Sequence, residues 1–81
     1  MFPLLTSARH VKDHALRLQF ADGAEGEIDL LPELDGEIFL PLRELDYFKR
    51  FRLDPEIHTI VWPNGADFAP EFLYAKITVP A

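Results

Sequence analysis

Two stretches of alternating apolar and polar residues, separated by a glycine turn, constrain the fold of this chain more than any other feature. Residues 16–20 read Leu-Arg-Leu-Gln-Phe, and residues 27–30 read Glu-Ile-Asp-Leu. A period of two residues is typical of strands that bury one face. The Asp22-Gly23 dipeptide between the two stretches is a common hairpin turn. The sequence therefore predicts an antiparallel hairpin.

The register of this hairpin follows from the requirement that its apolar residues share one face, because directly opposite residues point the same way. A two-residue loop would set Leu18 opposite Glu27. A three-residue loop, 21–23, with Gly23 in the left-handed conformation, brings the apolar residues together instead. The predicted pairs are Phe20 with Ala24, Leu18 with Gly26, Leu16 with Ile28 and, on the outer face, Arg17 with Glu27.

The segments around this hairpin are less regular. Upstream, Val11 and Leu16 are an odd number of residues apart, so a regular strand would place these two apolar side chains on opposite faces. This predicts a bulge or bend at residues 12–14. Downstream, proline and glycine predict an irregular crossing over residues 31–41. The apolar residues expected to anchor this crossing are Leu34, Ile38 and Phe39.

A short helix is predicted after the crossing, with Pro41 at its first position. Three apolar residues spaced by three support it, as does an acid–base pair four residues apart. These residues are Leu42, Leu45 and Phe48, with Asp46 and Arg50.

The last third of the chain predicts one strand and one helix. Residues 54–57 form a turn with proline at its second position, and the β-branched run 58–62 follows as a central strand covered on both faces. Pro70 and Glu71 suit a helix start, so a helix is predicted over 70–76. The fold class is α+β: a small antiparallel sheet, comprising the hairpin and a central strand ending at Trp62, with two short helices.

Size and composition limit what such a fold can do. The chain has 81 residues, 48% hydrophobic and 27% charged, which is typical of one folded domain spanning 1–81. It has no cysteine, so disulfides, thiolate metal sites and thiol nucleophiles are excluded. No apolar run approaches the roughly 20 residues that cross a bilayer. We expect a soluble, cytoplasmic protein that does not bind membranes.

The charge is negative and unevenly distributed. The net charge of -6 has the wrong sign for binding phosphates, so direct nucleic-acid binding is disfavoured. Seven of the 14 acidic residues lie between positions 22 and 37, a stretch without lysine or arginine. One interpretation is an acidic face that recruits a basic partner. The other is a solvated edge that prevents aggregation.

No set of residues predicts catalysis, a metal or a cofactor. His10 and His14 have the i,i+4 spacing that binds metal on a helix, but they lie in a predicted strand and no third ligand has a diagnostic spacing. Ser7, the only serine, lacks the glycines of a nucleophile elbow. We therefore predict no catalytic residue, no metal ligand and no cofactor.

The turn after the predicted central strand, residues 62–67, has two interpretations. It can be a binding corner that displays Asn64 and Asp67, or a structural turn in which Trp62 caps the core and Asp67 bonds nearby N–H groups. An alternative function, a small-ligand or enzymatic site, would be centred on His58, Asn64 and Asp67.

A family resemblance rests on the hairpin and on this corner. The matching residues are Leu16-x-Leu18-x-Phe20-x-Asp22-Gly23-x-x-Gly26-x-x-Asp29-Leu30, then Phe39, Leu42 and Phe48, then Thr59-Ile60-Val61-Trp62-Pro63-Asn64-Gly65-Ala66-Asp67 and Pro70-Glu71-x-Leu73-Tyr74. From about residue 11 to 74 the chain resembles the bacterial family called domain of unknown function 2442. The resemblance implies a small α+β domain with no established activity. It also implies a neighbouring gene for a second small protein, of domain of unknown function 4160, as in a toxin–antitoxin pair.

These observations together predict a non-catalytic protein-interaction module, antitoxin-like, that binds a protein partner. That partner would be the small protein encoded by the neighbouring gene. A homo-oligomer formed through exposed edge strands is a further possibility. The candidate interaction residues are Glu25, Glu27, Asp29, Trp62, Asn64 and Asp67.

Overall fold

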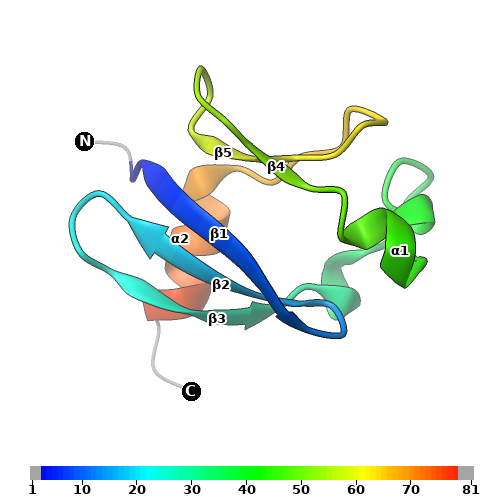
Figure 1. Ribbon diagram of the computed structural model, residues 1–81, viewed down its shortest axis with the longest axis horizontal. Coiled ribbons are helices and arrows are strands. Elements are labelled where there is room, and N and C mark those ends of the chain that lie inside the picture. Colours follow the sequence, from blue (N-terminus) through cyan, green and yellow to red (C-terminus); the bar gives the residue numbers. More distant parts are fainter. Residues whose placement is uncertain (1–2, 79–81) are drawn as a thin grey trace.

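Two antiparallel sheets form the framework of the computed structural model, which describes residues 3–78 (Figure 1). The larger sheet has three strands in the order β1 (Leu5–Lys12), β2 (Ala15–Phe20) and β3 (Glu25–Asp29). The smaller sheet pairs β4 (Arg52–Asp54) with β5 (Thr59–Val61). With its helices, the chain has the predicted α+β fold.

The predicted β2–β3 hairpin and its register are confirmed. Leu16 lies opposite Ile28, Leu18 opposite Gly26 and Arg17 opposite Glu27. The Phe20 N–H donates to the Ala24 carbonyl at 2.8 Å. Gly23 has a φ of 94°, the left-handed conformation that the three-residue loop requires.

The irregularity predicted at residues 12–14 is also confirmed, and it reverses the chain completely. The β1–β2 register shifts between His10 and Lys12. Asp13 then adopts a φ of 44°, a left-handed conformation that aspartate tolerates better than most residues do. The bend therefore joins β1 and β2 as a second hairpin.

Helix α2 (Pro70–Thr78) covers the inner face of the larger sheet, behind the strands in Figure 1. It starts at the predicted residue and extends two residues further than predicted. A side chain at Gly26 would place its Cβ 3.1 Å from the Ile77 Cβ, so the close approach of helix and strand depends on glycine. The Phe20 and Tyr74 rings meet edge to face at 5.1 Å.

The crossing and the predicted helix differ in part from expectation. Leu34 is buried as predicted, but Ile38 is 46% exposed and anchors nothing, so its predicted role was wrong. The predicted single helix is divided into a 3-10 turn, η2 (Leu40–Arg43), and a short α1 (Leu45–Phe48), because Glu44 between them is extended. A further 3-10 turn, η1 (Leu31–Glu33), precedes them.

The predicted acid–base pair of this helix is not among the ion pairs of residues 3–78. The Arg50 guanidinium lies 5.9 Å from the centre of the Tyr47 ring instead.

The strand predicted at residues 58–62 is covered on both faces, because consecutive residues Thr59 and Ile60 are both buried. Its predicted position at the centre of the main sheet was wrong. Within residues 3–78, β5 pairs with β4 and forms one isolated bridge, from Val61 to Asp67, but it does not pair with a strand of the larger sheet. A main-chain bond joins β1 to the turn before β5: the Leu5 N–H donates to the His58 carbonyl at 3.2 Å.

One hydrophobic core joins both sheets and the helices. Its fully buried large side chains are Leu5, Leu16, Leu18, Phe20, Leu30, Leu34, Leu42, Phe48, Ile60 and Leu73.

Candidate functional site

The face of the larger sheet opposite α2 carries polar and charged side chains, and we call it the outer face. Cross-strand pairing assigns nine residues to it: Ser7, Arg9, Lys12, Ala15, Arg17, Gln19, Glu25, Glu27 and Asp29. All are exposed except Ala15 and Arg17, which are half-buried. The basic side chains lie on β1 and β2, whereas all three acids lie on β3.

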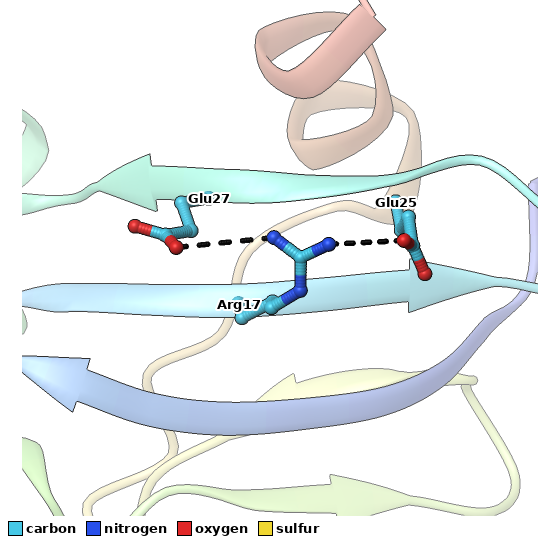
Figure 2. Close-up of polar contacts among 3 residues, drawn as sticks. All are labelled: Arg17, Glu25 and Glu27. Atoms are coloured by element: carbon cyan, nitrogen blue, oxygen red, sulfur yellow. Dashed lines mark hydrogen bonds and ion pairs between the residues drawn. The ribbon is translucent and has the colours of Figure 1, made fainter.

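Arg17 binds two of these acids (Figure 2). Its guanidinium lies 2.9 Å from a Glu25 carboxylate oxygen and 3.8 Å from one of Glu27. The shorter contact is therefore with the diagonal neighbour and not with the directly opposite residue. Both glutamate side chains are about 50% exposed, so each pair stabilises the fold by at most about 1 kcal/mol. Arg17 contributes one positive charge against the two glutamates that it binds, so these two ion pairs do not neutralise the β3 side of the outer face.

Strand β3 is an edge strand, paired on one side by β2. The Leu30 N–H donates to the His14 carbonyl at 3.0 Å, and antiparallel bonds alternate from there along the ladder. Gly26 and Ile28 therefore direct their main-chain groups at β2, whereas Glu25, Glu27 and Asp29 direct theirs away from the sheet. We call these outward-directed groups the free edge, because no strand among residues 3–78 pairs with them.

An open hollow of about 600 Å³ lies where β3 ends. We call it the end hollow. Its rim is charged and its apolar residues come from β2, β3 and the segment that follows β3. The lining residues are Lys12, Asp13, His14, Ala15, Glu27, Ile28, Asp29 and Leu31. A hollow this open suits a side chain of a larger molecule better than an enclosed metabolite.

The Asp22 carboxylate connects the hairpin loop beside β3 to helix α2. It accepts a hydrogen bond from the Tyr74 hydroxyl and another, 2.9 Å long, from the Ala24 N–H. These bonds lower the pKa of Asp22 below its usual value, and the bond from Tyr74 has the larger effect. The bond to the carboxylate raises the pKa of Tyr74. The loop is therefore held against the helix at neutral pH.

Hydrogen bonds from Trp62 and Asn64 tie the corner at residues 62–67 to the rest of the fold. Trp62 is 2% exposed, and its indole N–H donates to the Phe48 carbonyl at 2.8 Å, so burial contradicts its role as a surface contact. The Asn64 amide is used at both ends, donating to the Ile38 carbonyl at 2.8 Å and accepting from the Ala66 N–H at 3.0 Å. Asp67 is exposed, and its carboxylate has no hydrogen-bond partner within the described chain, so the bonds to nearby N–H groups that the structural interpretation expected of Asp67 are not formed there.

The residues of the alternative site, His58, Asn64 and Asp67, come from the segments on either side of β5. His58 is half-buried in the turn between β4 and β5, with a φ of 56°. None of these three residues lines the end hollow.

The two histidines with metal-binding spacing each serve the local structure. The Nε2–H of His10 donates to the Asp13 carbonyl at 2.7 Å, and that of His14 to the Arg43 carbonyl at 3.0 Å. The His14 ring also packs on Phe48, with centroids 4.8 Å apart. Within residues 3–78, no three histidine, aspartate or glutamate side chains are grouped closely enough to hold a metal.

The sequence analysis identified the three acids of β3 and raised the possibility of exposed edge strands, but it did not assign a free edge to β3 and did not predict the end hollow. The predicted central strand at residues 58–62 left open a second partner for β3, and the structure excludes that pairing within residues 3–78.

Fold and surface together define a small α+β protein whose charged groups lie on an open sheet face and edge. The family described as "protein of unknown function (DUF2442)" matches residues 5–79, and this chain belongs to that family. No curated protein and no solved structure is similar enough to match. Within the described part of the chain, no helix has the length and apolar character needed to cross a membrane.

Proposed function

We propose that this protein is a non-catalytic interaction module of the bacterial cytoplasm that binds a protein partner through its outer face. It would act as the antitoxin-like member of a two-gene system. The observation that supports the proposal is the contrast between the two faces of the larger sheet: α2 packs on one (Figure 1), and the other carries polar and charged side chains that are mostly exposed within residues 3–78.

The charge layout supports a basic partner. Glu25, Glu27 and Asp29 lie on one strand, and the ion pairs that Arg17 forms with Glu25 and Glu27 are exposed. Such pairs exchange readily with lysine or arginine from another molecule, because water and salt already weaken them. Complementary charge would raise the association rate and suppress wrong partners.

The test is co-expression with the small protein encoded by the neighbouring gene, followed by co-purification. Reversal of Glu25, Glu27 and Asp29 to lysine should weaken the complex by about tenfold or more. The matched control reverses Glu37, Glu44 and Asp46, which are also exposed but lie outside the sheet. Circular dichroism checks that both triple variants fold.

Two results would contradict the proposal. One is a wild-type chain that never associates with that neighbour. The other is equal loss of binding in the two triple variants, which would indicate an effect of net charge and not of the outer face.

A further inference from the structure

The free edge of β3 indicates how the partner binds. We propose that an extended segment of the partner, with lysine or arginine at alternate positions, adds to β3 as a fourth strand. This inference rests on the proposed function and specifies its binding mode and the chemistry of the partner.

The main chain of β3 supplies the first argument. Its outward-directed N–H and C=O groups, at Glu25 and Glu27, lie two residues apart, which is the repeat of a strand and matches the groups of any extended peptide. Strand addition of this kind uses main-chain bonds for affinity and side-chain pockets for specificity.

The side chains of β3 determine the sequence pattern of the added strand. Residues of that strand opposite Glu25, Glu27 and Asp29 would share the outer face with them. Opposite charges stabilise such cross-strand pairs, whereas like charges destabilise them, so these positions call for lysine or arginine. The intervening positions point toward the face that α2 covers, where Ile77 is half-buried beside Gly26, and call for apolar residues.

The same charges argue against a second copy of this chain as the occupant. Antiparallel pairing of β3 with another β3 would bring the carboxylates of Glu25, Glu27 and Asp29 onto one face opposite those of the copy. Like charges directly opposite each other are destabilising. The edge is therefore protected against self-association but open to a basic strand.

The end hollow extends this binding surface beyond β3. It lies at the Asp29 end of the strand, and Leu31, which lines it, is 41% exposed. A fourth strand that continues past Asp29 would place an apolar side chain there, against Ala15 and Leu31.

The first experiment measures the binding of a nine-residue peptide in which lysine and valine alternate. The control peptide has the same composition with the lysines in one block. Calorimetry should show about tenfold weaker binding of the control, because only alternation places every lysine on one face of a strand. Equal binding of the two peptides would overturn strand addition.

The second experiment separates main-chain bonding from charge with Glu27→Ala and Glu27→Pro. Both variants remove the carboxylate, but only proline also removes the outward-directed N–H. An edge strand tolerates proline at such a position, because the N–H that is lost makes no bond within the sheet. Glu27→Pro should bind the alternating peptide at least about tenfold more weakly than Glu27→Ala. Equal affinities would overturn the proposal.

A third experiment leaves the protein unchanged, and so gives an answer even if Glu27→Pro does not fold. N-methylation of peptide residues whose N–H groups face β3 should abolish binding, whereas methylation of the alternate residues should not. Equal effects would overturn strand addition, as would a complex of two protein chains in light scattering. Failure here, with the charge-reversal result on the co-expressed neighbour intact, would remove strand addition and leave the proposed function standing.

Discussion

The three-stranded sheet and the segment that follows it, residues 31–68, are held together in different ways. The sheet relies on repeated main-chain bonds between neighbouring strands, in a register set by residue parity. The later segment has only short helices and strands within residues 31–68, and bonds from a side chain to a distant carbonyl supplement its local main-chain bonds. Replacement of a single side chain should therefore lower the free energy of unfolding more in residues 31–68 than in the three-stranded sheet.

These single bonds join segments far apart in the sequence. The Trp62 indole bonds the Phe48 carbonyl, and the buried Thr59 hydroxyl bonds the Phe68 carbonyl at 2.6 Å. The Arg43 guanidinium bonds the Leu34 carbonyl at 3.0 Å. In each case the side chain donates to a carbonyl that has no main-chain partner in a helix or strand. A buried carbonyl without a hydrogen-bond donor destabilises a fold.

Replacement of Trp62 should have the largest effect. Trp62→Ala removes a buried ring and a hydrogen bond, and we expect it to lower the free energy of unfolding by about 3–5 kcal/mol. Trp62→Phe keeps most of the packing and should cost about 1–3 kcal/mol, since the Phe48 carbonyl loses its donor. Urea denaturation measures both. A loss below about 1 kcal/mol for the alanine variant would refute the importance of this bond.

Matched threonine variants sharpen the comparison. Thr59→Val should destabilise the protein by about 1–3 kcal/mol because its bond is buried. Thr6→Val removes a similar bond to the Gln19 carbonyl, 3.1 Å long but exposed on β1, and should cost less than about 0.5 kcal/mol. Equal effects in thermal denaturation would show that the two regions respond alike.

A small effect is expected from Arg17→Ala on the outer face. Both of its ion pairs are exposed, so stability should fall by less than about 1 kcal/mol, and by less still in high salt. Denaturation at low and high ionic strength tests this. A larger, salt-independent loss would mean that the pairs support the sheet.

The hydrogen bond between Tyr74 and Asp22 should make a small contribution to folding stability that depends on pH. Because the pKa of Asp22 is lowered in the fold, this stability is present above the usual aspartate pKa and is lost as the pH falls through the lowered value. Because the pKa of Tyr74 is also raised in the fold, the contribution of Tyr74 to folding stability is present below the usual tyrosine pKa. That contribution is lost as the pH rises through the raised value.

Comparison of wild type with Tyr74→Phe from acid to alkaline pH measures this contribution. The difference in stability should be largest in the neutral range and should shrink at both extremes. A difference independent of pH would contradict the assignment.

Parity explains why the hairpin could be predicted and the later segment could not. In residues 16–30, alternation determines the face of the sheet on which each side chain lies. The length of the loop at Gly23 then determines which residues of β2 and β3 are paired. In residues 31–41 no period holds, and the apolar Ile38 offers its carbonyl to Asn64 while its side chain faces solvent. The spacing of three in Leu42, Leu45 and Phe48 fits a 3-10 turn as well as an α-helix, which is why one helix was expected where two short ones occur.

The candidate site was predicted in part for the same reason. The outer-face position of Glu25, Glu27 and Asp29 follows from parity, and the structure places them there. The free edge depends on sheet order, which local patterns do not determine. Trp62 was a candidate contact because of its size and its turn, but packing from Phe48 and Phe68 buries it.

Amide hydrogen exchange of β3 tests most directly the claim that this protein works through an open sheet edge. In the free protein, Glu25 and Glu27 should exchange at least about tenfold faster than Gly26 and Ile28, and the alternating lysine–valine peptide should slow the glutamate amides selectively. Strong protection of Glu25 and Glu27 in a free monomer would contradict the account, since the edge would then already be covered.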